Sequence, residues 1–108
     1  KVFVITSGEN MAIHAAANIA MAVENFKDRG YAQLGGLILN RRNVKNEDAK
    51  VEELAEDIHS KVIGTLSRSE LVTDAEEQKK TVIEAYPDSE MAEEYRILAG
   101  KIRTLCGI

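Results

Sequence analysis

The residues best suited to chemistry are polar side chains that directly follow short apolar runs. Asn40 follows the run Leu34–Leu39, and its carboxamide offers one acceptor and two donors. These groups match the N6 donor and the N7 acceptor of adenine, a pairing that proteins also use to read DNA. An asparagine after a strand can instead cap a turn. The position of Asn40 by itself leaves both interpretations open.

Two further polar segments follow apolar runs in the same way. Thr6–Glu9 comes after Val2–Ile5, and Ser67–Ser69 comes after Val62–Leu66. Short β-rich apolar runs are typical of strands that are buried in a parallel sheet. In such sheets, ligands bind beyond the carboxyl ends of the strands. We therefore expect the ligand edge to comprise Thr6–Glu9, Asn40–Asn43 and Ser67–Ser69.

The first helix is expected directly after the first strand. Thr6-Ser7-Gly8-Glu9 matches a capping box, in which the hydroxyl and the carboxylate satisfy each other's backbone donors at a helix start. Apolar residues then recur at helical spacing to about Phe26. The face expected to pack on the sheet consists of Ala12, Ala15, Ala16, Ile19, Val23 and Phe26.

The remaining elements complete an alternating pattern. Helices are expected over Val51–Ile58 and Leu71–Lys80, and a last helix is expected to start at Pro87. The brief apolar segment Thr81–Ala85 is expected to be an extended connector. The pair Gly35-Gly36 marks a close approach of another backbone or a ligand. Together these features predict one α/β domain, with a three-stranded parallel sheet flanked by about four helices.

Charge argues against sequence-independent binding to nucleic acid, because phosphate recognition needs clustered positive potential. The net charge is −4. The basic group Arg41, Arg42 and Lys45 is flanked by the acids Glu47 and Asp48. We interpret this group as a solvated face.

Cysteine and histidine usage limits metal chemistry. Cys106 is the only cysteine, so an intrachain disulfide, cluster or zinc site is not expected. His14 and His59 have no partners at ligand spacing. No apolar stretch approaches the length of a membrane span and no secretion leader is evident, so a cytoplasmic location is the expectation.

Three segments span nearly the whole chain in a characteristic order and separation. They are Thr6-Ser7-Gly8-Glu9-Asn10-Met11-Ala12, Leu34-Gly35-Gly36-Leu37-Ile38-Leu39-Asn40-Arg41-Arg42-Asn43, and Thr81-Val82-Ile83-Glu84 with Glu94-Tyr95-Arg96. These segments resemble signatures of the nitrogenase iron protein family, which includes relatives that reduce tetrapyrroles.

The resemblance implies a partial P-loop NTPase fold, in which residues 1–108 form the C-terminal part of a single ATPase domain. Intact family members are homodimeric, ATP-dependent reductases that use ATP/ADP with Mg. They hold one [4Fe–4S] cluster between two chains and donate electrons to a nitrogenase or nitrogenase-like metalloprotein. This chain has neither a G-x-x-x-x-G-K-[ST] phosphate loop nor the cluster cysteines. Alone, it is expected neither to hydrolyse ATP nor to transfer electrons.

Residue by residue, the resemblance implies a nucleotide site and a dimer-facing surface. The nucleotide-binding positions are Asn40 at the adenine, Arg68 at the base or phosphate, Glu76 at the ribose and Tyr95 beside the adenine. The dimer-facing positions are Glu9 and Met11.

Each of these side chains also has an ordinary structural interpretation. Arg68 can be a surface residue paired with Glu70, Glu76 a solvated helix residue and Tyr95 a core residue. Glu9 can be a capping residue, and Met11 can simply occupy space on its helix. Several family positions also differ, with Ser67 for proline, Ser69 for aspartate, and Thr73 and Met91 for glutamine. These departures indicate a divergent relative.

Two other functions remain open. One is a non-redox ATPase of the same class that acts in partitioning or cluster delivery, and the other is a stand-alone α/β interaction domain without a ligand. If the chain is part of a larger domain, a sheet face and edge should be exposed and apolar, and self-association should follow.

Overall fold

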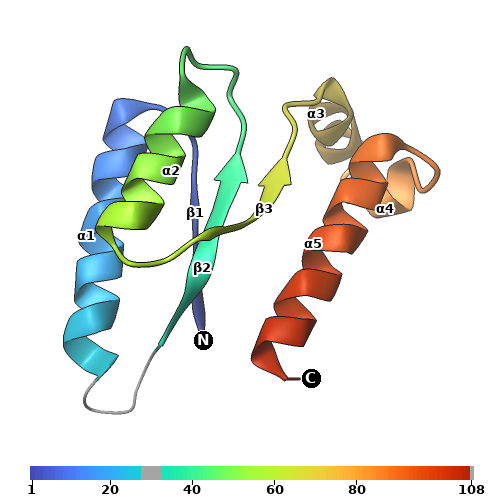
Figure 1. Cartoon of the computed structure of the whole chain (residues 1–108). Helices are drawn as coiled ribbons and strands as arrows, with labels where there is room; N and C mark the ends of the chain where they lie inside the picture. The colour runs from blue at the N-terminus through green and yellow to red at the C-terminus, as the bar shows by residue number, and fades with distance from the viewer. Residues whose placement is uncertain (28–32, 108) are drawn as a thin grey trace.

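A three-stranded parallel sheet forms the centre of the protein, in a computed structural model that describes residues 1–27 and 33–107. The strands are β1 (Val2–Thr6), β2 (Leu34–Asn40) and β3 (Val62–Leu66), in the spatial order β1-β2-β3. Figure 1 shows the strands side by side between the helices α1 and α2 on one side and α5 on the other. The predicted strands are therefore confirmed.

Two helices pack on the first face of the sheet. They are α1 (Asn10–Lys27) and α2 (Glu47–Asp57). Side chains of successive strand residues point to opposite faces, so Leu37 and Leu39 of β2 meet these helices together. The buried core here contains Val4, Ala16, Leu37, Leu39, Val51, Leu54 and Ala55.

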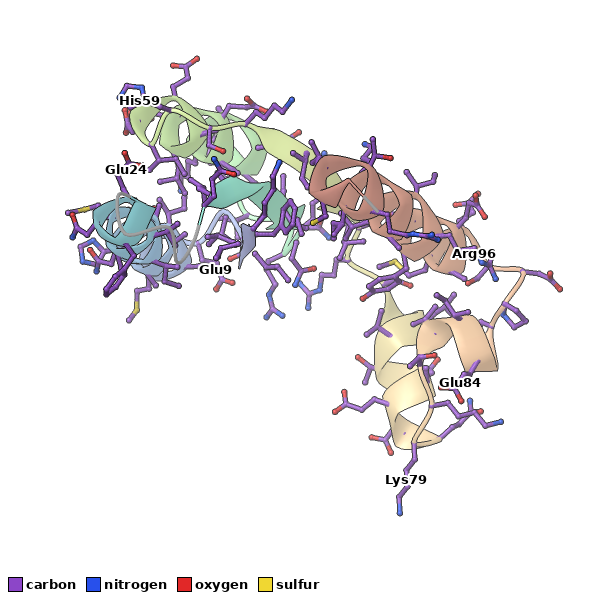
Figure 2. All side chains as sticks on the ribbon, turned by 90° about the horizontal axis from the view of Figure 1, so that it is seen from below. Glu9, Glu24, His59, Lys79, Glu84 and Arg96 are labelled. Carbon is purple, nitrogen blue, oxygen red and sulfur yellow. The ribbon has the colours of Figure 1, made fainter. Side chains whose placement is uncertain are left out.

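On the opposite face, α5 (Glu90–Cys106) packs against β3, and the short helices α3 (Glu70–Glu77) and α4 (Val82–Ala85) continue the C-terminal region beside α5. The buried core on this face contains Ile38, Ile63, Leu66, Ala75, Val82, Met91, Ala92 and Leu98. Figure 2 shows α3 and α4 extending away from the sheet, with Lys79 at the far tip. Residues 1–27 and 33–107 thus contain five helices, where about four were predicted, in an α/β arrangement as predicted.

The glycine pair in β2 permits close packing of neighbouring side chains. A Cβ on Gly35 would lie 2.6 Å from the Phe3 ring, and one on Gly36 would lie 2.7 Å from the Ile63 side chain. Gly36 also has a φ of 149°, which L side chains rarely adopt. A close approach is therefore observed, but the nearest groups are side chains of the two adjacent strands rather than the predicted backbone or ligand.

The expected capping box at Thr6–Glu9 is wrong. The Thr6 hydroxyl donates to the Ser7 carbonyl at 2.9 Å, and α1 begins only at Asn10, where the Ile13 N–H donates to the Glu9 carbonyl. Thr6 cannot serve as a helix cap because it is the last residue of β1 and is buried.

The expectation of an extended connector over Thr81–Ala85 is also wrong. Val82–Ala85 forms the short helix α4. Thr81 Oγ1 accepts from the Glu84 N–H at 3.2 Å, and the Glu84 carboxylate accepts from the Thr81 N–H at 3.5 Å, which together make a capping box. The last helix starts later than predicted, at Glu90 instead of Pro87, because Ser89 caps it by accepting from the Ala92 N–H.

The buried face of α1 is rotated from the predicted one. Ala16 and Val23 are buried as expected, but Ala15, Ile19 and Phe26 are exposed. The core instead takes Ile13 and Ala17. The rotation arises because α1 packs against α2 as well as the sheet, so the contact with both neighbours sets its orientation.

Apolar residues are exposed along the β1 side of the molecule. β1 is an edge strand, and Ile5 is 61% exposed. Met11, Ile19 and Phe26 of α1 are exposed as well. The predicted exposure of an apolar edge is confirmed, and the self-association expected from it stays a prediction.

Among residues 1–27 and 33–107, no helix is both long enough and apolar enough to span a membrane.

Candidate functional site

Three loops meet at the carboxyl edge of the sheet, because parallel strands end on the same side. The β1–α1 loop contains Ser7–Glu9, the β2–α2 loop contains Arg41–Asn46, and the β3–α3 loop contains Ser67–Ser69. The second and third loops are joined where the sheet ends, since the Arg41 N–H donates to the Leu66 carbonyl at 2.9 Å. This edge is where the sequence predicted the ligand.

A buried carboxylate ties the first two loops together. Glu47 is only 6% exposed, and its Oε2 accepts from the Gly8 N–H at 2.8 Å. The same carboxylate accepts from the Arg42 N–H at 3.1 and 3.2 Å, and from the Asn43 N–H at 3.2 Å. The interpretation of Glu47 as part of a solvated face is therefore wrong. It serves as the shared acceptor for backbone donors of both loops.

The environment of Glu47 favours its charged form. Burial raises the pKa of the carboxyl, but the hydrogen bonds from Gly8, Arg42 and Asn43 and the charge of Arg41 lower it, and the net pKa lies below the ordinary value of 4.5. Gly8 makes the approach possible, because a Cβ there would lie 2.5 Å from Glu47 Cγ and 2.8 Å from its Cα.

Further polar contacts connect all three loops. Arg42 Nε lies 3.5 Å from Glu9 Oε1, which joins the first loop to the second. Arg68 Nη1 donates to the Arg42 carbonyl at 3.3 Å, which joins the second to the third. The third loop is also held by α5, where Glu94 Oε1 accepts from the Ser67 N–H at 2.7 Å.

Asn40 lies at the carboxyl end of β2, on the edge where ligands of open α/β sheets bind. It is the last residue of β2, and its side chain is exposed. Within the described parts of the chain its carboxamide makes no hydrogen bond, so the alternative role of capping a turn is not observed. Its donors and acceptor are available to a ligand.

The other three predicted nucleotide residues are divided between two hollows. Arg68 lines one of about 370 Å³ beside the N-terminus of α5. Glu76 and Tyr95 line another of about 390 Å³ between α3, α4 and α5. Leu71 and Val72, consecutive in α3, line one hollow each. The structure thus brings Arg68 to the strand-end loops with Asn40 and places Glu76 of α3 and Tyr95 of α5 at a separate hollow.

Two of the four positions that depart from the family pattern have local structural roles. Ser69 caps α3, since its hydroxyl accepts from the Leu71 N–H at 3.2 Å. Met91 is buried in the core of the second face. Thr73 and Ser67 are exposed. A glutamine at Met91 would place an amide where the structure has apolar contacts.

The predicted dimer-facing residues lie together at the start of α1. Glu9 is exposed and accepts from the Ser7 hydroxyl at 3.1 Å, while Met11 is 88% exposed. The two side chains are thus accessible to a partner. Glu9 does not have the helix-capping role that the sequence suggested for it.

Sequence reasoning missed the two carboxylates that hold the loops, Glu47 and Glu94. Glu47 bonds to Gly8, 39 residues away, and Glu94 bonds to Ser67, 27 residues away. Such distant partners leave no periodic signal. The one local hint was Gly8, two residues after the end of β1, because a glycine permits close approach by another part of the chain.

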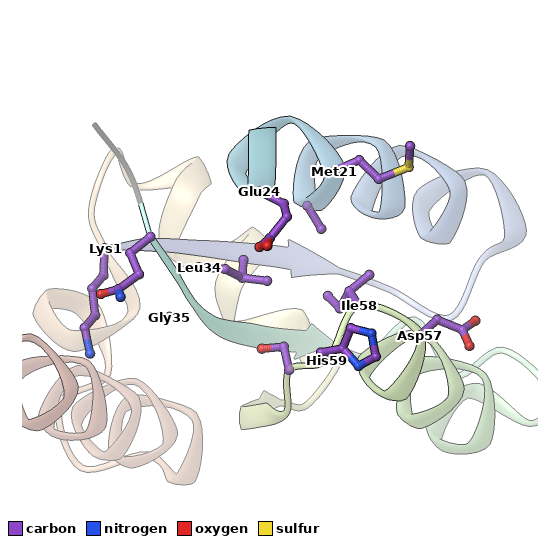
Figure 3. Close-up of a pocket in the computed structure, with 11 residues that line it drawn as sticks. Lys1, Met21, Glu24, Leu34, Gly35, Asp57, Ile58 and His59 are labelled. Carbon is purple, nitrogen blue, oxygen red and sulfur yellow. The ribbon is translucent and has the colours of Figure 1, made fainter. Parts of the chain in front are cut away.

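Another hollow, of about 610 Å³, lies at the opposite edge of the sheet. Figure 3 shows Lys1, Glu24, Asp57 and His59 around it, near the amino ends of β1 and β2. Ligands of open α/β sheets bind at the carboxyl ends of the strands. The position of this hollow therefore does not favour it as the site.

The residues of this chain do not fit an iron–sulfur cluster. Cys106 is exposed in the last turn of α5, and a cluster needs several thiolates. Nowhere in residues 1–27 or 33–107 do three His, Cys, Asp or Glu side chains gather as metal ligands would.

A solved structure has a similar fold. The cell division ATPase MinD of Pyrococcus furiosus superposes with a TM-score of 0.73 at 13% sequence identity. The match covers 95% of this chain and 43% of that ATPase, so the chain spans less than half of its length. This likeness confirms the predicted α/β fold.

The sequence itself matches a family model over residues 1–105. That model describes 4Fe-4S iron–sulfur cluster binding proteins of the NifH/frxC type. The match covers almost all of the chain and agrees with the resemblance of the strand-end segments. The chain belongs to the NifH/frxC family.

Proposed function

We propose that this chain is the nucleotide-base-binding, C-terminal portion of an ATP-dependent [4Fe–4S] iron protein that donates electrons to a nitrogenase or nitrogenase-like partner. The observation that carries the proposal is the exposed carboxamide of Asn40 at the carboxyl end of β2, within a family match to residues 1–105. The carboxamide offers the groups that adenine requires.

Each remaining residue of the proposed site has a chemical part. The Arg68 guanidinium is planar and always charged, so it suits a base face or a phosphate, and its bond to the Arg42 carbonyl keeps it near Asn40. Glu76 can accept hydrogen bonds from ribose hydroxyls. Tyr95 supplies an aromatic surface on the same hollow. One nucleotide that contacts all four residues would extend across both hollows, which Leu71 and Val72 of α3 line one each.

The cluster, Mg and the catalytic phosphate loop belong, in this proposal, to protein beyond this chain. Cys106 is not assigned to the cluster. The proposed homodimer places Glu9 and Met11 toward the partner subunit.

The alternative function is a non-redox ATPase. The similarity to MinD does not support this alternative, because at 13% sequence identity it shows only a shared fold.

Titration with ADP tests the proposal. We expect shifts of the Asn40 and Arg41 amide resonances in the NMR spectrum, and Asn40→Ala should weaken ADP about five- to tenfold, as for one or two neutral hydrogen bonds. Asn18→Ala is the matched control, because Asn18 is exposed on α1, in a different element. GDP should bind less tightly, since guanine presents an acceptor where adenine presents its N6 donor.

Three results would contradict the proposal. Unchanged spectra at millimolar ADP would favour an interaction domain without a ligand. Equal affinity for ADP and GDP would indicate recognition of phosphate alone. Turnover of ATP by a preparation of only these residues would show that the phosphate-binding half is not needed.

A further inference from the structure

We infer that Glu47 is a positioning residue that couples the loop carrying Glu9 to the loop that follows Asn40. The inference rests on the proposed function only for the roles of those two loops. The coupling itself is a property of the folded chain.

The geometry of the Glu47 carboxylate differs from that of a local helix residue. Glu47 is the first residue of α2, and bonds to Arg42 and Asn43, five and four residues earlier, could merely shape the start of that helix. The bond from Gly8 is different, because it comes from an element 39 residues away and is the shortest of the set at 2.8 Å. One side chain thus accepts from the backbones of two loops.

Close packing makes the link rigid. Gly8 is buried against the Cα, Cβ and Cγ atoms of Glu47, with no room for a methyl group between them. A displacement of the first loop must therefore move Glu47, and the hydrogen bonds carry that movement to Arg42 and Asn43. The contact between Arg42 Nε and Glu9 Oε1 adds a second, exposed link between the same loops.

The two coupled loops have different proposed tasks. The first leads into Glu9 and Met11, the proposed dimer-facing residues, and the second directly follows Asn40, the proposed adenine-reading residue. A shared carboxylate lets a nucleotide at Asn40 alter the surface that a second subunit would meet. Such coupling requires a physical element that both sites bias, and Glu47 with its two loops is that element.

Hydrogen exchange at neutral pH tests the coupling without a nucleotide. Glu47→Gln keeps the size of the side chain but replaces one acceptor oxygen with an NH₂ group. We expect amide exchange at Gly8, Arg42 and Asn43 to accelerate together, by at least about tenfold, as for loss of a hydrogen bond to a charged acceptor. Glu52→Gln, at an exposed position of the same helix, should leave all three unchanged. Acceleration confined to Arg42 and Asn43 would overturn the inference.

A measurement on the unmodified chain covers the case in which Glu47→Gln does not fold. The Gly8, Arg42 and Asn43 amide protons should shift with pH at one common midpoint below 4.5, because all three bond to one carboxylate. Other charged groups at these loops are Glu9, Arg41, Arg42 and Asp48. A Gly8 amide that does not follow this midpoint would also overturn the inference.

ADP then separates the two proposals. In the unmodified chain, ADP should shift the Gly8 and Glu9 amides together with that of Asn40. In Glu47→Gln, the Asn40 shift should persist while those at Gly8 and Glu9 disappear. Equal Gly8 shifts in both chains would refute the coupling. An unmodified chain without any Asn40 shift would refute the proposed function instead, and the exchange experiment would still decide the role of Glu47.

Discussion

Two segments of this chain contain the same local pattern, a threonine followed three residues later by a glutamate, and they form different structures. Thr81 and Glu84 make a capping box at the start of α4. Thr6 and Glu9 do not, because Thr6 still belongs to β1 and α1 starts at Asn10. A capping pattern therefore acts only where the chain is free to begin a helix.

The same contrast holds for the regions around these segments. The strand-end loops are fixed by bonds between residues far apart in sequence, such as Gly8 with Glu47 and Ser67 with Glu94. The α3–α4 region is fixed by bonds between near neighbours, with Ser69 and Thr81 each capping the helix that follows. We expect substitutions in the first region to act over long distances and substitutions in the second to act locally.

The largest effect is expected for Glu47→Ala. It removes the acceptor for three backbone donors, of which the Gly8 N–H is buried, so the free energy of unfolding should fall by about 2–3 kcal/mol. Urea unfolding measures the change. Glu52→Ala, at an exposed position of the same helix, should stay within about 0.5 kcal/mol of the unmodified chain. A loss below about 1 kcal/mol would show that water replaces the carboxylate easily.

A pair of glycine substitutions sharpens the comparison. Gly8→Ala forces a methyl group into Glu47 and should lower the free energy of unfolding by about 2 kcal/mol. Gly100 lies in α5, and a Cβ there would meet nothing within 4 Å. Gly100→Ala should therefore raise the free energy of unfolding by about 0.5–1 kcal/mol, because alanine has the higher helix propensity. Similar values for both variants would mean that the contact between Gly8 and Glu47 relaxes without cost.

A smaller and more local effect is expected for Thr81→Ala. Loss of the helix cap should cost about 1 kcal/mol, and faster amide exchange should be confined to α4 and its neighbours in α3. Thr73→Ala, at an exposed position within α3, should change the free energy of unfolding by less than about 0.5 kcal/mol. Faster amide exchange in the β1–α1 loop, which contains Gly8, would show that the two regions do not respond separately.

The smallest effect is expected from pH. The pKa of Glu47 is lower in the folded chain than its ordinary value of 4.5, so the folded state binds this proton more weakly than the unfolded state does. The stabilisation is therefore complete above about pH 4.5 and is lost as the pH falls through the folded-state pKa. In urea unfolding, the difference between the unmodified chain and Glu47→Gln should narrow below about pH 4.5. If this difference in the free energy of unfolding does not change with pH, the stabilisation comes from contacts that do not depend on the charge of Glu47.

Sequence by itself determined the order of strands and main helices and the edge at which the polar residues gather. Apolar runs and helical spacing predicted β1, β2 and β3 nearly to the residue, because their burial imposes a local hydrophobic pattern. The same reasoning placed Asn40 at the end of β2. The family resemblance then indicated which of the polar residues to consider together.

Tertiary structure alone decided how these elements meet. It showed which face of α1 is buried, because that depends on α2 as well as the sheet. It placed Arg68 with the strand-end loops but Glu76 and Tyr95 at a separate hollow between α3, α4 and α5. It also revealed Glu47 as a buried acceptor, which no local pattern could do because its decisive partner lies 39 residues away.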